Sequence, residues 1–312
     1  MTNFMIGFNA VMPVLLYILI GQLIHRIGWM SRKSLSEMNK ALFAFFLPLN
    51  LFNNVYHMDL DKNFNPRTLA FVIIYAIAIF IVYALIIPIF QKRNDRRGVM
   101  LQGSIRSNAI LFGLPLGTAL LGKENLGMVS IALAIIVPVN NILSVIALSI
   151  YTDEDFSFKD LMHKIISNPM VIATASGIVV AALGLRLPQS VEVAFDNLSA
   201  MTSPLALTVM GGLFKFDKIK DADWSLYFTV INKLLVNPAI ALSLAVIFGL
   251  RDDNIISVLI ATAGPTAVSS YAQAVMAGGD EDLANQIVVF TTCFAMFTLV
   301  FWIWLLKSLA LF

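Results

Sequence analysis

Charged residues are scarce in this chain of 312 residues, where Asp, Glu, Lys and Arg together make up only 13%. A soluble domain typically carries about 25% charged residues. Hydrophobic residues instead reach 59%, and the mean hydropathy is +0.83. A soluble fold of this size could not bury so much apolar surface, so the composition predicts a protein whose solvent is lipid.

The chain is equally poor in the side chains that carry catalysis and metal binding. Its single cysteine, Cys293, lies in an apolar run, which excludes a disulfide framework and a thiolate metal cluster. The three histidines lie at connectors, so no histidine base is expected at membrane depth. No Walker loop and no His-Glu-x-x-His motif is present. We therefore expect no enzyme, no cofactor, no resident metal and, without a basic patch, no nucleic-acid partner.

What the sequence has in abundance is long apolar runs, ten in number. A helix that crosses a bilayer needs roughly 20 apolar residues, and each run is close to that length. The sequence therefore predicts an all-α polytopic membrane protein. Its expected spans are residues 5–24, 36–57, 67–90, 98–121, 126–150, 166–184, 190–213, 224–249, 254–277 and 285–309.

The distribution of basic residues predicts the orientation of these spans. The five connectors after the odd-numbered spans carry 12 Lys and Arg, against 6 in the termini and the remaining connectors. Basic residues concentrate on the cytoplasmic side of membrane proteins. Both termini are therefore expected outside the cytoplasm.

The two halves of the chain share a register of helix breakers at an offset of 156 residues. Each half, 1–156 and 157–312, contains five spans, and an odd number forces the second half to be inverted relative to the first. Inverted repeats are typical of secondary transporters, whose substrate site lies near the midplane between the repeats. The matched pairs are Pro13 and Pro169, Gly21 and Gly177, Gly28 and Gly184, Pro48 and Pro204, and Gly122 and Gly278.

Two equivalent spans carry breaks in mid-membrane. The fourth has Gly-Leu-Pro-Leu-Gly at 113–117, and the ninth has Gly264-Pro265 beside small polar residues. Lipid cannot satisfy freed backbone groups, so such breaks occur where they are buried in protein or line a wet cavity. A kink made only for packing is the alternative. The matched pair predicts broken fourth and ninth helices with the substrate site between them.

The sequence Ser-Asn-Ala-Ile-Leu-Phe-Gly-Leu-Pro-Leu at 107–116, followed by Gly122, resembles the fourth-helix motif of the auxin efflux carrier family. Leu47-Pro48-Leu49 and Gly278-Gly279-Asp280 extend the likeness along the chain. The resemblance implies the fold of the bile/arsenite/riboflavin transporter superfamily, with crossing helices 4 and 9. It also implies a scaffold of helices 1, 2, 6 and 7, and a transport domain of helices 3–5 and 8–10 that moves like an elevator. A homodimer through the scaffold helices and a bacterial inner-membrane location follow from the same likeness.

By position, the resemblance places Asn108 and Pro265 at the crossover and Asn141, with Asn140, beside it. The chain lacks the long hydrophilic loop of the plant carriers, which removes auxin as an assumed substrate. The full predicted substrate site surrounds the breaks. It consists of Asn108, Arg106, Ser107, Gly113, Pro115, Gly264, Pro265, Thr266, Asn141, Asn140, Leu51 and Asn50.

Two basic residues fall inside predicted spans without a nearby carboxylate. Arg106 either supplies positive field to a substrate anion or snorkels toward the cytoplasmic headgroups. Lys233 is expected to snorkel. No Asp or Glu stands beside either break, so Na⁺ coordination there would depend on unwound carbonyls and on hydroxyls such as Ser269 and Ser270.

These features predict a secondary transporter that moves a small organic anion, a mono- or dicarboxylate, by alternating access. Two alternatives stay open. One is a Na⁺-coupled symporter of a larger amphipathic anion, and the other is a non-transporting membrane sensor with a transporter fold.

Overall fold

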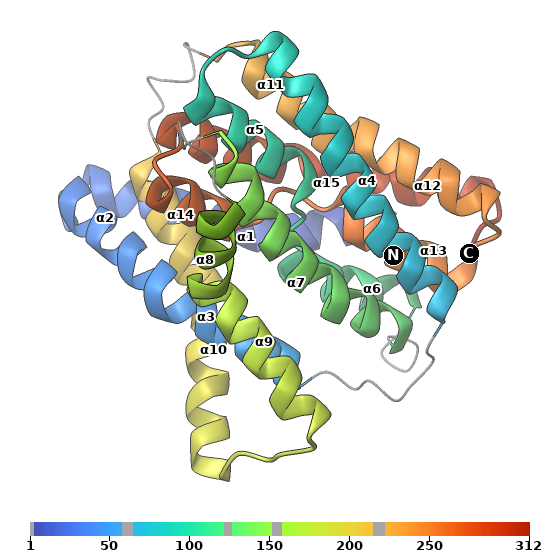
Figure 1. Cartoon of the computed structure of the whole chain (residues 1–312), viewed down its shortest axis with the longest axis horizontal. Coiled ribbons are helices and arrows are strands. Elements are labelled where there is room, and N and C mark those ends of the chain that lie inside the picture. Colours follow the sequence, from blue (N-terminus) through green and yellow to red (C-terminus); the bar gives the residue numbers. More distant parts are fainter. Residues whose placement is uncertain (1–2, 58–64, 122–126, 152–157, 215–221) are drawn as a thin grey trace.

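The computed structural model describes residues 3–57, 65–121, 127–151, 158–214 and 222–312, and the secondary structure of these residues is helical (Figure 1). Before the last helix, four described helices are unbroken over more than 22 residues: α1 (Asn3–Arg26), α4 (Pro66–Phe90), α7 (Gly127–Ser149) and α10 (Gln189–Leu213). α15 (Glu281–Ser308) closes the chain. The shorter helices are α2 (Arg32–Ala41), α3 (Leu47–Tyr56), α5 (Asn94–Ile105), α6 (Leu114–Leu121), α8 (Phe158–Ser167), α9 (Pro169–Ala182), α11 (Trp224–Ile231), α12 (Asn237–Ile247), α13 (Asp252–Ala263) and α14 (Val268–Met276).

Several of these helices are joined by π-helical turns rather than by loops. The turns are η1 (Leu42–Phe46), η2 (Ala109–Gly113) and η5 (Asn232–Val236). Each is followed by a helix with proline at its second residue: Pro48, Pro115 and Pro238. Proline has no N–H to donate, and a wider π turn accommodates the interrupted backbone ladder.

By length and apolarity alone, four described helices are able to cross a membrane: Pro66–Phe90, Ile131–Ser149, Trp224–Ile247 and Glu281–Ser308. A fifth candidate is the pair Lys159–Ser167 and Pro169–Ala182, which is bent by 64°. The all-helical class predicted from the sequence is thus confirmed. The count of ten spans, the inverted repeat and the division at residue 156 stay predictions.

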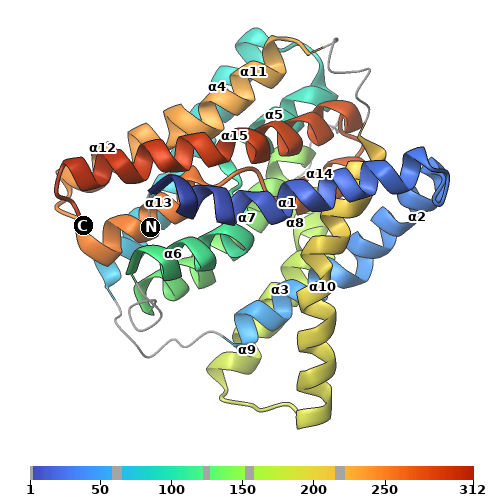
Figure 2. The ribbon, with the colours of Figure 1, turned by 180° about the vertical axis from the view of Figure 1, so that it is seen from behind.

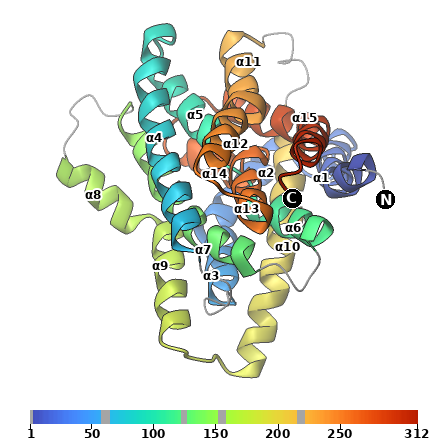
Figure 3. The ribbon, with the colours of Figure 1, turned by 90° about the vertical axis from the view of Figure 1, so that its right-hand side faces the viewer.

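The helices pack in two groups. In the first, α1 packs against α10, and α3 packs between α9 and α10 (Figure 3). α1 and α10 approach to backbone contact, because a Cβ on Gly21 would lie 1.8 Å from the carbonyl oxygen of Thr208. Small residues permit this approach between helices in lipid.

The second group surrounds α7 and α13. α4, α5 and α13 pack against α7, and α12 packs against α13. α15 contacts both this group and α1, and Figure 2 shows that α1 begins and α15 ends at the same end of the molecule. A small cavity lies between the two groups and contains most of the predicted site.

Candidate functional site

The two interrupted helices meet at their breaks. α5 ends at Ile105 and η2 begins at Ala109, while α13 ends at Ala263 and α14 begins at Val268. Between these ends, Ser107 and Thr266 form an isolated antiparallel β-bridge. Each break therefore supplies hydrogen-bond partners to the other, which answers the requirement that freed backbone groups be satisfied in a medium without water.

Two backbone hydrogen bonds define the crossing. The amide of Asn108 donates to the carbonyl oxygen of Pro265 at 2.7 Å, and the amide of Ala267 donates to the carbonyl oxygen of Arg106 at 3.3 Å. The side chain of Thr266 donates to the carbonyl oxygen of Gly103 at 2.9 Å. These bonds fix the positions of residues 106–108, whose side chains reach the cavity.

The break in the fourth predicted span lies about two turns earlier than the sequence suggested. Gly113 ends η2 and Pro115 lies in the first turn of α6, so the segment expected to unwind is helical. Because Pro115 follows a π turn and lies at the start of a helix, its missing N–H does not interrupt the helical backbone there. Gly113 instead allows close packing, because a Cβ there would lie 2.5 Å from Cγ2 of Ile260 on α13.

Two backbone amides at the second break also donate hydrogen bonds within the protein. The amide of Thr266 donates to Oγ1 of Thr291 at 3.1 Å, and that of Ala267 to Arg106. Among residues 264–266, Thr266 thus has an internal partner for its amide, and Pro265 has no N–H to offer a substrate. Pro265 and Thr266 hold the crossing together, and Gly264, Pro265 and Thr266 are not among the residues that line the cavity.

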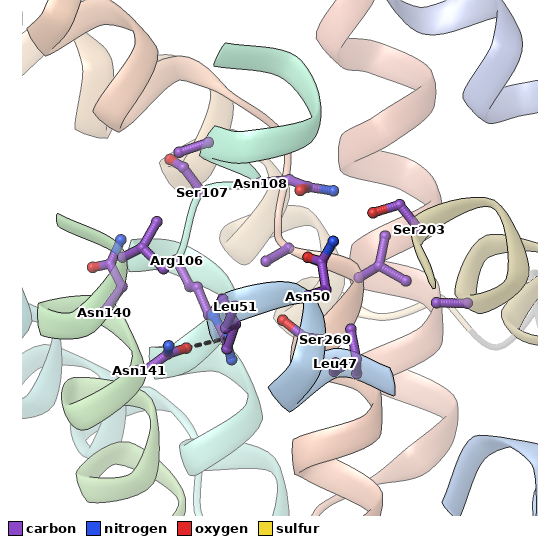
Figure 4. Close-up of a pocket in the computed structure, with 15 residues that line it drawn as sticks. Leu47, Asn50, Leu51, Arg106, Ser107, Asn108, Asn140, Asn141, Ser203 and Ser269 are labelled. Carbon is purple, nitrogen blue, oxygen red and sulfur yellow. Dashed lines mark hydrogen bonds between the residues drawn. The ribbon is translucent and has the colours of Figure 1, made fainter. Parts of the chain in front are cut away.

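The cavity beside the crossing has a volume of about 60 Å³. Its wall combines polar side chains from α3, α7 and α14 with the residues of the first break (Figure 4). Seven of the twelve predicted substrate-site residues line it, together with Ser269. The lining residues are Leu47, Asn50, Leu51, Arg106, Ser107, Asn108, Ala109, Val137, Asn140, Asn141, Ser203, Ala206, Ala267, Val268 and Ser269.

Three of the four asparagines that line the cavity differ in how much of their hydrogen-bonding capacity the protein uses. Asn50 is fully engaged, since it donates to Ser199 and accepts from Asn54. Asn141 donates to Oγ1 of Thr174 at 3.3 Å and accepts from Arg106. Asn108, in contrast, makes no side-chain hydrogen bond to another described residue and lies at the cavity wall. Its amide can both donate to and accept from a ligand.

Arg106 has an exposed fraction of 4%, and its partners among the described residues are neutral. One Nη donates to Oδ1 of Asn141 at 2.6 Å, and the other donates to Oε1 of Gln273. Snorkelling to the headgroups is thus excluded for this side chain. A buried guanidinium held by two amide oxygens retains its charge without compensation from the residues described.

Lys233 is the second buried cation, and its exposed fraction is 0%. Its ammonium donates to Oγ of Ser107 at 2.5 Å and to the carbonyl oxygen of Thr262 at 2.9 Å. The expectation that it snorkels is therefore wrong, because it points to the crossing rather than to the membrane surface. Among the described residues, Arg106 and Lys233 are the only charged side chains that are buried.

Sequence reasoning missed four polar residues around this site: Ser203, Thr174, Gln102 and Gln273. Ser203 lines the cavity, and the other three belong to the hydrogen-bond network of Arg106 and Asn141. No local motif marks any of these four residues. The sequence feature that could have indicated them is their position in the spans that carry the breaks or in neighbouring spans. Ser270 is buried with its hydroxyl unpaired among described residues, but it does not line the cavity.

Polar side chains continue from the cavity along the facing surfaces of α3 and α10. Beyond Asn50 and Ser199, Asn53 donates to Asp196 at 2.9 Å. Further along, the hydroxyl of Tyr56 donates to Glu192 at 2.5 Å. This polar seam joins α3 to α10 within the first group of helices.

Interrupted, crossing helices beside a cavity with a buried cation in its wall are typical of membrane transporters. Comparison with known proteins agrees. Residues 6–303 match the membrane transport protein family, and the chain belongs to this family of auxin efflux carrier-like proteins. It is also 21% identical to an uncharacterized transporter of Methanocaldococcus jannaschii, over 97% of this chain and all of that one.

Proposed function

We propose that this transporter carries a small organic anion, a mono- or dicarboxylate, across the membrane. The observation that carries the proposal is the state of Arg106: it is buried at the cavity wall, and the described residues that it contacts are neutral. Taking a charge out of water costs several kcal/mol unless it is paired. A substrate carboxylate would supply the missing charge and the missing acceptors.

The volume of the cavity favours a small anion over a large amphipathic one. A single water needs about 10–15 Å³ on this measure. The volume of about 60 Å³ therefore accommodates about four to six water-sized groups, similar to acetate or malonate. A ligand with a rigid ring system would require the two helix groups to separate.

The proposed mechanism is elevator-type alternating access. The cavity lies between the group containing α3 and α10 and the group containing α7, while the crossing belongs to the second group together with α5 and α13. A rigid movement of the second group would carry the crossing and its bound anion past the first. We further propose ten spans in a bacterial inner membrane, with both termini outside, and a homodimer formed through the first group.

Two measurements on purified protein test this function. A thermal-shift screen against small carboxylates, with and without Na⁺, should show stabilisation by at least one of them, because a ligand that binds only the folded state raises its apparent stability. Proteoliposomes should then accumulate that anion. Stabilisation that requires Na⁺ would favour the symporter, and binding without accumulation would favour the sensor. A screen in which no carboxylate shifts the melting temperature would contradict the proposal.

A further inference from the structure

A second and larger cavity is lined by Gln273, a hydrogen-bond partner of Arg106. Its volume is about 500 Å³, and residues at the C-terminal ends of α7 and α14 and around the start of α9 line it. The predicted orientation places these helix ends toward the cytoplasm. Because Gln273 lines the large cavity, while Arg106 and Asn141 line the small one, the side chains that separate the two cavities are bonded to each other.

Arg106, Asn141 and Gln273 together form a partition between the two cavities, and Gln273 is the member that lines the larger one. Its Oε1 accepts hydrogen bonds from Arg106 and from Nε2 of Gln102, the second at 2.7 Å. Its own Nε2 lies 3.1 Å from Sδ of Met170, and a thioether is a weak acceptor. The Gln273 oxygen therefore accepts a strong hydrogen bond from the Arg106 cation, whereas the Gln273 nitrogen makes only a weak one to Met170.

The guanidinium of Arg106 has capacity for further ligands. It carries five N–H groups, and two of them donate to amide oxygens of described residues. The bond from Arg106 to Gln273 already has a charged donor, but a carboxylate adds the attraction of a full negative charge. This attraction favours a carboxylate at this position over the amide oxygen of Gln273.

We propose that Gln273 is a displaceable internal ligand of Arg106. In the absence of substrate it occupies the guanidinium and holds it in the partition between the two cavities. When an anion arrives, the amide oxygen leaves and the carboxylate takes its place. This inference rests on the proposed function, and it makes Gln273 a positioning residue that sets how strongly an anion must bind in order to be accepted.

The proposed exchange of the Gln273 amide oxygen for a substrate carboxylate is testable, because two variants should change the anion affinity in opposite directions. Gln273→Glu has nearly the same shape and supplies a permanent carboxylate, which forms an ion pair with Arg106. We expect the affinity for acetate or malonate to fall by about tenfold or more, while the melting temperature of the ligand-free protein stays the same or rises. Gln273→Met keeps the length but removes the acceptor. We expect its affinity for the same anions to rise several-fold while its ligand-free melting temperature falls.

The matched control is Gln91→Glu. Gln91 is also a buried amide with a side-chain partner, Ser225, but it lies at the end of α4 and lines neither cavity. Its substitution should leave anion affinity unchanged. The affinities are measured by calorimetry with acetate and malonate, and the melting temperatures are measured without ligand.

The outcomes separate this inference from the proposed function. If the wild-type protein binds neither anion, the proposed function fails, and the inference fails with it. If the wild type binds but both Gln273 variants weaken binding alike, Gln273 only supports the local structure. A lower ligand-free melting temperature for Gln273→Glu would also overturn the inference, because it would mean that Arg106 does not accept an internal anion.

Discussion

Replacement of Arg106 by glutamine separates the role of its charge from the role of its packing. The new side chain is shorter and neutral, and it can still form a hydrogen bond with one of the two amides, Asn141 or Gln273, that now hold the guanidinium. In the ligand-free protein the substitution removes a buried charge whose described partners are neutral. Replacement of buried charges by neutral groups is often neutral or stabilising. The ligand-free protein should therefore melt at the same temperature or higher.

The loss of anion binding follows from the same geometry. At an effective dielectric constant of about 20, a carboxylate ~4 Å from the guanidinium is attracted by about 4 kcal/mol. The anion must first displace an amide ligand, and a hydrogen bond to a charged group is worth about 1.5–3 kcal/mol. A net contribution of about 1–2.5 kcal/mol remains, which corresponds to an affinity about 5- to 70-fold lower in Arg106→Gln.

Calorimetry with the anion identified by the thermal-shift screen, together with melting of the ligand-free protein, tests both halves of this prediction. Arg67→Gln is the control, because Arg67 is exposed at the start of α4, away from the cavity. Wild-type affinity in Arg106→Gln would refute the reasoning. So would a large loss of ligand-free stability, since the charge would then be a structural requirement and its burial would say nothing about a ligand.

Three further predictions address other parts of the structure. Asn108→Ala should weaken anion binding by about 1–3 kcal/mol with little change in ligand-free melting; a lower melting temperature with unchanged affinity would assign Asn108 to the helix break alone. Gly21→Ala should destabilise the protein by about 1–3 kcal/mol, because its Cβ would collide with the backbone of Thr208; unchanged thermal melting would contradict the close approach of α1 and α10. Partial burial raises the pKa of Asp223, but its hydrogen bonds and ion pair with Arg96 outweigh this and keep the pKa below its ordinary value of 3.8. The stabilisation by this pair, about 0.5–1 kcal/mol, should be present at pH 7 and disappear as the pH falls through the lowered pKa. Denaturant unfolding of Asp223→Asn beside wild type checks this, and a difference that does not shrink as the pH falls from about 4 towards 2 would argue against the ion pair.

The positions of helices could be predicted from the sequence where apolar composition alone determines them. The expected spans 67–90 and 285–309 correspond to α4 (Pro66–Phe90) and to most of α15 (Glu281–Ser308). These runs contain no mid-helix break, so length and apolarity suffice. Asn65 and Asp280 cap the two helices through their side chains and explain where each begins.

The exact position of the first break could not be read in the same way. Gly113 and Pro115 are local signals of a weak helix, and they pointed to the right span but to the wrong turn. The non-helical residues are 106–108, because their backbone pairs with residues 265–267, which lie about 160 positions later in the chain. A partner at that distance in sequence is decided by tertiary packing.

Lys233 and Gln273 illustrate the same limit for side chains. Sequence alone gives their depth in a span but not the direction in which they point. The ammonium of Lys233 reaches Ser107 on another interrupted helix, and the amide of Gln273 reaches Arg106. Asn108 and Asn141 were identified because the family resemblance placed them, not because their local sequence was unusual.

The neutrality of the groups around Arg106 is itself an argument about mechanism. A resident carboxylate in place of Gln273 would pair with the guanidinium and lower the energy of the empty protein, but it would occupy the position that a substrate anion needs. An amide satisfies the geometry of the guanidinium while leaving its charge uncompensated, so the empty protein is held at a higher energy than the occupied one. Ser107 strengthens this arrangement, since the same residue that lines the cavity also accepts from Lys233. Stability that the empty protein lacks is therefore available as binding energy. This is why Arg106→Gln and Gln273→Glu, whose ligand-free forms should be at least as stable as wild type, should bind anions least.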